Sequence, residues 1–356
     1  MYLKATNHLC TSPFSSSIYS IGSKRLDPDS HRPYSSFSSK SEASASLKIE
    51  GEPMLRSVLK SMESVYLERN ITASKALQCI QSTEAGSICY DHFAFRTFGV
   101  NGHGIDAMAN LFLDCGYTRR DEMRFHEKKL KAVWFSPPCD ESELSYGDGA
   151  SGPLPRIFIS ELLVDQMSPE VQDIIKKYTE ASGNGYKHAA LASSLGSLTW
   201  NSPSYSDYSR LASESEYAAW TLINGFSLNH ATISVHRLRS ELKNINVLNS
   251  FIQSNLIKLN SKGGILKVSP DGLLLQSSTA ADSVRHIFSD GAEETIPCCY
   301  MEFAQRKVLP QFKSFPPEKI MEYHRRDGFE VGSADKIFES TFQEQTEIWI
   351  PGWRSL

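Results

Sequence analysis

The chain has 356 residues, of which 40% are hydrophobic and 22% charged, a composition that is typical of a folded globular protein and excludes wholesale disorder. Acidic and basic residues are interleaved and the formal net charge is −4, so nothing indicates a nucleic-acid-binding surface. No apolar run approaches the roughly 20 residues of a membrane-spanning helix, and no membrane association is expected.

The first 46 residues differ in composition from the rest of the chain. They are rich in Ser, carry several Lys and Arg, contain no acidic residue before Asp27, and lack the apolar block of a secretory signal. Residues 1–46 are therefore typical of an organelle transit peptide, with a merely disordered N-terminus as the alternative. Because Ser dominates and Arg is sparse, the stroma of a plastid (chloroplast or amyloplast) is favoured over a mitochondrion. Residues 47–356 are expected to form a single catalytic domain.

The domain is predicted to begin with helices and then to change to strands. Apolar residues at helical spacing predict an N-terminal helical segment over 53–85, with one helix over 53–68 and a second over 72–81 that has Thr72 as its N-cap. A first module over 86–165 follows. Its predicted elements are a strand over 87–98, a helix over 105–115, and strands over 117–123, 129–136 and 156–164.

A connecting region over 166–225 comes next. A helix is predicted over 168–180, whereas residues 181–212, rich in Ser, Gly, Tyr and Asn, match no pattern. Ser213 and Glu216 have the spacing of a capping box, which predicts that another helix begins there.

The pattern of the first module then returns in a second module over 226–310. Its predicted elements are a strand over 227–238, a helix over 245–259, and strands over 264–268, 273–277, 284–288 and 297–306. A C-terminal segment over 311–356 carries one predicted helix over 334–341.

The two modules form a weak internal repeat, recognised by the order of their elements rather than by sequence identity. Each begins with a histidine-bearing strand, continues with a helix and ends with further strands. The sequence therefore predicts an α+β fold, in which paired βαβββ modules face each other across a shared cleft, with N-terminal helices and a C-terminal helical segment.

Polar residues with metal-binding chemistry lie in three of the predicted strands. His92 and His230 each occupy the first strand of a module, and Glu302 lies in an apolar strand on the same face as Tyr300 and Arg306. Two histidines and one carboxylate from three strands can form the facial triad of non-haem Fe(II) oxygenases. The alternatives are histidines that are hydrogen-bonded in the core, and a salt bridge between Glu302 and an arginine.

Arg96 shares a strand face with His92 and lies four residues, roughly 13 Å, further along. A guanidinium binds a carboxylate well, so this side chain could meet the far end of a five- or six-carbon diacid whose other end is at the metal. A structural ion pair is the alternative.

The seven cysteines show no CxxC pair and no disulfide-framework spacing, so they are interpreted as reduced thiols. Adjacent Cys298 and Cys299 could form a redox feature, but in a strand such residues are more often small hydrophobic side chains.

Several ordered segments around these residues resemble the 2-oxoadipate dioxygenase/decarboxylase family, and more narrowly its plant plastid branch. The resemblance covers about residues 50–350 and is carried by residues 91–99 (DHFAFRTFG), 129–138 (KLKAVWFSPP), 229–235 (NHATISV), 300–306 (YMEFAQR) and 326–341 (RDGFEVGSADKIFEST).

The resemblance implies a vicinal-oxygen-chelate fold, which is built from paired βαβββ units, with Fe(II) as cofactor. It places the metal ligands at His92, His230 and Glu302 and the arginine for the distal carboxylate at Arg96. It further implies main-chain and hydroxyl contacts with the substrate near Gly332 and Ser333. The implied reaction converts 2-oxoadipate and O2 to 2-hydroxyglutarate and CO2 in lysine catabolism. The implied partners are this small-molecule 2-oxo diacid and O2, with no nucleic acid and no membrane, and the sequence does not determine the oligomeric state.

Two other functions compete with the oxygenase. A glyoxalase-like lyase or isomerase would use a divalent metal without O2; such enzymes often have an additional acidic ligand, for which the sequence offers no clear candidate. A non-catalytic plastid scaffold or binding protein would need no metal, and the intact set of His92, His230 and Glu302 argues against it.

Overall fold

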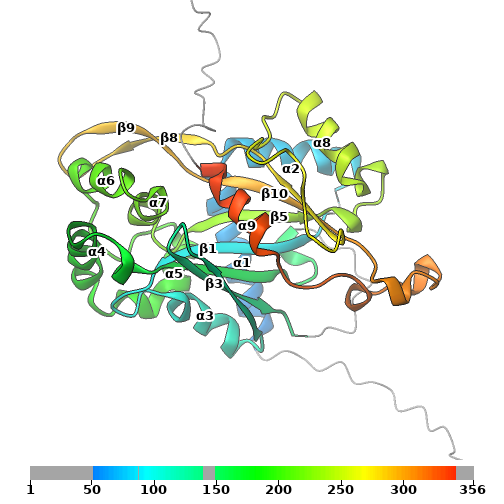
Figure 1. The fold of residues 1–356 in the computed structure, drawn as a ribbon, viewed down its shortest axis with the longest axis horizontal. Coiled ribbons are helices and arrows are strands. Elements are labelled where there is room, and N and C mark those ends of the chain that lie inside the picture. The colour runs from blue at the N-terminus through cyan, green and yellow to red at the C-terminus, as the bar shows by residue number, and fades with distance from the viewer. Residues whose placement is uncertain (1–50, 87, 139–148, 342–356) are drawn as a thin grey trace, which may run out of the picture. The chain divides into compact units, whose positions relative to one another are not determined.

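The computed structural model describes residues 51–86, 88–138 and 149–341 (Figure 1). The predicted transit peptide with Cys10, residues 139–148 with Cys139, and the chain beyond residue 341 lie outside the described residues. Among the helices that are described, none combines the length and the apolar character that crossing a membrane requires.

Two helices open the described chain, α1 (Glu52–Arg69) and α2 (Ile71–Thr83). Helix α1 buries Leu55, Leu59, Met62 and Tyr66, the three- and four-residue spacing of one apolar face. The prediction of Thr72 as the N-cap of the second helix is wrong. The Asn70 side chain accepts a hydrogen bond from the Ala73 N–H and begins the helix there, while the Thr72 side chain donates to Asp282 instead.

The first module has the predicted order of elements. Its first strand, β1, is buried at every position because it pairs with β4 on one side and with the second module's β5 on the other. The edge strand β2 is largely exposed. The elements are β1 (Tyr90–Phe98), α3 (Ile105–Asp114), β2 (Thr118–Phe125), β3 (Leu130–Ser136) and β4 (Arg156–Leu162).

The connecting region is helical. Part of it matched no sequence pattern because α5 and α6 have only seven and eight residues, about two turns, too few for a periodicity to stand out. The predicted capping box is wrong: Ser215 caps α7, and Ser213 instead ends α6. The helices are α4 (Pro169–Ala181), α5 (Ala189–Leu195), α6 (Tyr205–Ala212) and α7 (Glu216–Asn224).

The second module repeats the first but contains an inserted hairpin. Strands β8 (Ser283–Ile287) and β9 (Glu293–Pro297) pair only with each other, so the strand predicted over 284–288 belongs to this hairpin and not to the module's sheet. The predicted helix over 245–259 ends at Ser254, and β5 passes into a short helical turn after Ser234. The module consists of β5 (Leu228–Ser234), α8 (Ile245–Ser254), β6 (Lys267–Val268), β7 (Leu274–Ser278) and β10 (Tyr300–Arg306).

Both modules build one eight-stranded sheet in the order β2-β3-β4-β1-β5-β10-β7-β6. The first strand of each module is parallel to its last strand, and the two first strands meet in antiparallel pairing at the centre. This arrangement confirms the predicted α+β fold with paired βαβββ modules. Helix α9 (Val331–Phe338) lies over the sheet and contacts strands of both modules, so it covers the central strands (Figure 1).

Candidate metal centre

His92, His230 and Glu302 come from the three central strands β1, β5 and β10. One potential ligand atom of each lies within 4.8 Å of the others. The Glu302 Oε2 atom is 3.6 Å from His92 Nε2 and 3.1 Å from His230 Nε2, and all three side chains are buried. Two imidazole nitrogens and one carboxylate oxygen so close together make a donor set that fits a metal ion.

Each histidine is oriented by the side chain directly before it. His92 Nδ1 lies 2.8 Å from Asp91 Oδ1, and His230 Nδ1 lies 3.0 Å from Asn229 Oδ1. Because both partners are oxygen acceptors, each Nδ1 carries the hydrogen and each Nε2 lone pair is directed to the site. Sequence reasoning missed both orienting residues; the only signal was a short acceptor side chain preceding each histidine.

The ionisation of Glu302 and the neutral state of His230 suit metal binding. Burial raises the pKa of Glu302, but the two histidines outweigh it and lower that pKa to about 2. Burial lowers the pKa of His230 to about 4, so its imidazole is neutral at pH 7. Burial also lowers the pKa of His92, but Glu302 and Asp91 more than offset it and leave it raised. The Gln276 side chain donates to Glu302 Oε1 at 2.7 Å, which leaves Oε2 for the histidines.

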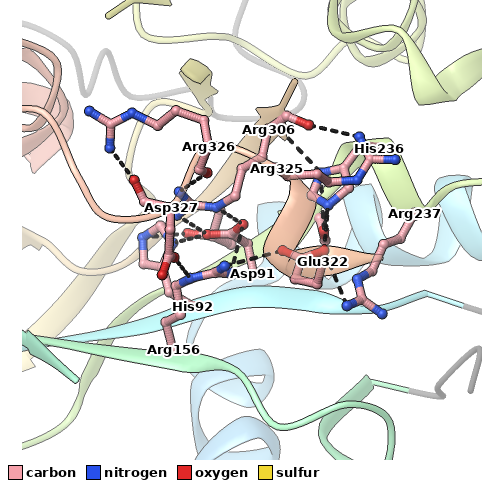
Figure 2. Close-up of polar contacts among 12 residues, drawn as sticks. Asp91, His92, Arg156, His236, Arg237, Arg306, Glu322, Arg325, Arg326 and Asp327 are labelled. Atoms are coloured by element: carbon pink, nitrogen blue, oxygen red, sulfur yellow. Dashed lines mark hydrogen bonds and ion pairs between the residues drawn. The ribbon is translucent and has the colours of Figure 1, made fainter. Parts of the chain in front are cut away.

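Behind His92, Asp91 is held in a fully buried ion pair (Figure 2). Arg306 Nε and Nη2 donate to the two Asp91 oxygens at 2.7 and 2.9 Å, and Arg306 Nη1 donates to the Gly328 carbonyl at 2.7 Å. Burial raises the pKa of Asp91, but Arg306 and His92 hold it well below its usual value. The acid that pairs with Arg306 is therefore Asp91, and the alternative of a salt bridge between Glu302 and Arg306 is wrong.

Further charges extend this ion pair into the C-terminal segment (Figure 2). Arg156 lies 3.6 Å from Asp91 and binds Asp327 and Glu322 at 2.8 and 3.2 Å. The Glu322 carboxylate also contacts His236 Nε2 at 3.0 Å. His92 is thus connected to the segment that follows the second module.

A cavity separates the three polar residues from helix α9. Its other wall is apolar and consists of Phe158 from β4, Phe329, and Ile337 and Phe338 from α9. The Phe329 ring packs edge-on against His92 at 4.8 Å between ring centroids. The site can therefore be closed to water on the side opposite its ligands.

Arg96 is buried in β1, four residues after His92. Its guanidinium carbon lies 5.1, 5.0 and 5.8 Å from the ring centroids of Tyr217, Trp220 and Phe338. Among the described residues, no carboxylate lies within 4.0 Å of it, so the alternative of a structural ion pair finds no support there. Arg96 and the metal residues line separate cavities, and Phe338 borders both.

Gly332 and Ser333 lie in the first turn of α9. Ser333 is buried, but α9 reaches the cavity through Ala334, Ile337 and Phe338, and neither of the two predicted residues lines it. Their contact with substrate stays a prediction.

Cys298 and Cys299 are buried before β10 with their sulfur atoms 3.5 Å apart. No disulfide forms among the cysteines that the structure describes, which agrees with the interpretation as reduced thiols.

The family model described as 2-oxoadipate dioxygenase/decarboxylase matches residues 52–314. The chain belongs to this family. It is 57% identical over 328 residues to "2-oxoadipate dioxygenase/decarboxylase, chloroplastic" from Arabidopsis thaliana, with 92% of this chain and 88% of the relative covered. It is 60% identical over 294 residues to the chloroplastic/amyloplastic enzyme of Oryza sativa, with 83% and 80% covered. The predicted plastid location agrees with both names.

Solved structures of family members and more distant relatives share the fold. The hydroxyglutarate synthase of Oryza sativa, solved in complex with 2-oxoadipate, has a TM-score of 0.82 and 57% identity, covering 87% of this chain and 99% of its own. A glyoxalase-superfamily protein from Ralstonia eutropha, with a TM-score of 0.59 and 18% identity over 78% of this chain and 86% of its own, is similar in fold alone. These likenesses confirm the predicted fold of paired βαβββ modules.

Proposed function

We propose that this protein is an Fe(II)-dependent plastid enzyme that converts 2-oxoadipate and O2 to 2-hydroxyglutarate and CO2 in lysine breakdown. The observation that carries the proposal is the buried cluster of His92, His230 and Glu302 at the centre of the sheet. Membership in the family and relatives of 57% and 60% identity that bear the name of this activity support it.

His92, His230 and Glu302 would hold the iron, which when bound supplies the oxidation chemistry with O2 that side chains cannot provide. Two neutral imidazoles and one carboxylate leave a divalent ion with one positive charge, which attracts the anionic 2-oxo acid group. Asp91 and Asn229 keep both Nε2 atoms directed to the ion, and the apolar wall around Phe158 and Phe329 excludes water.

Arg96 binds the distal carboxylate of the substrate in this proposal. Burial lowers the pKa of its guanidinium, and a buried cation without an anionic partner is costly unless a ligand provides one. The aromatic rings around it hold the guanidinium in place. A diacid would thus be oriented with its 2-oxo end at the metal residues and its other carboxylate at Arg96.

An oxygenase is favoured over the lyase alternative because the described residues offer no additional acidic ligand in the cavity. Beyond the three proposed ligands, no His, Cys, Asp or Glu of the described residues lines it. The metal would therefore have three protein ligands and free positions for substrate and O2.

The test is anaerobic loading of the full chain with Fe(II), followed by 2-oxoadipate and air, with O2, CO2 and 2-hydroxyglutarate recorded. We expect one equivalent of each per substrate consumed. Iron binding without O2 uptake would favour the lyase or isomerase, and absence of iron binding would favour the scaffold. The variant Glu302→Gln should lose iron and activity, whereas the same change in Glu293, on the exposed hairpin, should keep both.

A further inference from the structure

Tyr300 lines the metal cavity but has no role in the reaction proposed above. It lies two residues before Glu302 on β10, and its ring stacks on His230 at 4.6 Å with an interplanar angle of 25°. Its main-chain carbonyl accepts a hydrogen bond from the Tyr66 hydroxyl at 2.6 Å. Both contacts hold the phenol in one position relative to the metal residues.

The Tyr300 hydroxyl is buried and makes no hydrogen bond of good geometry among the described residues, although the Arg96 guanidinium lies beside it. A phenol hydroxyl keeps its proton at neutral pH and can donate one hydrogen bond. Buried hydroxyls in folded proteins almost always have a partner, and an exception inside a cavity indicates a missing ligand.

Arg96 provides a second unused donor in the same part of the interior. Its Nε–H also lacks a partner among the described residues, and its Nη2 reaches only a carbonyl and the Thr341 hydroxyl, at 3.4 and 3.2 Å. The Arg96 guanidinium and the Tyr300 phenol interact directly, so the two donors lie side by side. The strands that carry the two residues, β1 and β10, flank β5 with His230.

We propose that the Tyr300 hydroxyl is a second donor to the distal carboxylate of the substrate, beside Arg96, and that the pair selects diacids of one length. The inference rests on the function proposed above. A carboxylate has two oxygens that can each accept hydrogen bonds, and the two orphan donors match it. Because Tyr300 stacks on a metal ligand, its hydroxyl lies at a fixed distance from the metal and sets the reach that a diacid must have.

The test is anaerobic calorimetric binding of two acids to the Fe(II)-loaded full chain. 2-Oxoadipate has the distal carboxylate, and 2-oxohexanoate has the same chain length without it. Tyr300→Phe keeps the ring stack and removes only the hydroxyl. We expect it to weaken 2-oxoadipate binding by about tenfold or more, as for a lost hydrogen bond to a charged group, and to leave 2-oxohexanoate binding and iron content unchanged.

A matched control is Tyr208→Phe, which removes a hydroxyl on α6 outside the metal cavity and should change neither affinity. The double variant Arg96→Gln/Tyr300→Phe should lose less diacid affinity than the sum of the single losses, because both donors serve one carboxylate. Equal losses for both acids in Tyr300→Phe, or no loss for 2-oxoadipate, would overturn the inference.

These outcomes are separable from the proposed reaction. A wild-type protein that binds 2-oxoadipate more tightly than 2-oxohexanoate but consumes no O2 would overturn the reaction and leave the assignment of Tyr300 standing. A wild-type protein that turns over 2-oxoadipate but binds both acids equally would overturn the roles of Tyr300 and Arg96 at the distal carboxylate and leave the reaction standing. Binding of neither acid would overturn both.

Discussion

The two modules have the same topology but contribute different chemistry to the centre they enclose. In each module the last strand runs parallel to the histidine-bearing strand. Glu302 pairs with the residue two positions after His230, and Phe158 pairs with the residue two positions after His92. Phe158 therefore occupies in the first module the position of Glu302 in the second. A repeat that could provide two carboxylates provides one carboxylate and one aromatic ring.

A second difference lies behind the histidines. In the first module Asp91 contacts His92 and is itself paired with Arg306, whereas in the second the neutral Asn229 contacts His230. The duplicated backbone thus fixes where the histidines lie, and the side chains differ between the modules. The first module has the charged partner of its histidine, Asp91, and the second has the charged residue that we propose as a metal ligand, Glu302. On the side of the first module, the cavity is lined by the Phe158 ring and not by a second carboxylate.

Placing a second carboxylate at position 158 should have the largest effect on activity. Phe158→Glu places an acid where symmetry would put a second Glu302, so the metal would gain a fourth protein ligand and lose a free position. We expect metal content to be kept and O2 consumption with 2-oxoadipate to fall to background, measured with an oxygen electrode and by elemental analysis.

Phe158→Gln is the control for this change, because it has a similar polar side chain without the charge. We expect it to keep part of the activity. If Phe158→Glu were as active as Phe158→Gln, position 158 would not face the metal and the equivalence with Glu302 would be wrong.

Replacing Asp91, the charged partner of His92, with a neutral asparagine like Asn229 beside His230 should have the next largest effect. Asp91→Asn leaves Arg306 buried without its carboxylate, which should lower the free energy of unfolding by about 3 kcal/mol. Losing the charged support should also weaken iron binding by about tenfold to 100-fold. Urea unfolding of the metal-free protein and competition with a chelator measure the two effects.

The double variant Asp91→Asn/Arg306→Leu separates the ion pair from the orienting hydrogen bond. We expect it to regain part of the lost stability, because no buried charge is left uncompensated, but not the lost iron affinity. Recovery of iron affinity in the double variant would mean that Asp91 acts only through Arg306.

The ion-pair network behind His92, which includes Glu322, predicts that the stability of the protein depends on pH. Burial raises the pKa of Glu322, but His236 and Arg156 hold it well below its usual value of 4.5. A carboxylate with a lowered folded-state pKa stabilises the protein above its unfolded-state pKa, and this contribution is lost as pH falls toward the folded value. Glu322→Gln should therefore be less stable by about 2 kcal/mol at pH 7 and lose less stability between about pH 5 and pH 3. Urea midpoints across this range would test it, and parallel curves for variant and wild type would contradict it.

Sequence patterns identified the parts of this centre that lie within single strands. Glu302 stood out because an acid in an apolar strand needs a partner, and the histidines stood out because their strands begin the two halves of a repeat. The partners could not be predicted, since Asp91 and Arg306 are 215 positions apart and only the strand order brings them together. No sequence pattern marked Phe158, because a phenylalanine in a buried strand is ordinary. Its position is notable only because the equivalent position of the second module has the carboxylate of Glu302. Strand β9 escaped notice because most of its residues are exposed and lack the alternation of a core strand.

The smallest expected effect comes from a position where only the second module has a hydroxyl. Thr232 is the counterpart of Ala94, two residues after the histidine, and its Oγ1 lies 3.0 Å from His92 Nε2. A metal would take that nitrogen's lone pair, so this hydrogen bond belongs to the metal-free protein alone. Thr232→Ala should therefore destabilise the metal-free protein by about 1 kcal/mol and raise iron affinity about fivefold, because the competing bond is gone. A lower iron affinity in chelator competition would instead mean that the hydroxyl supports the bound metal, and the second module would then hold both histidines.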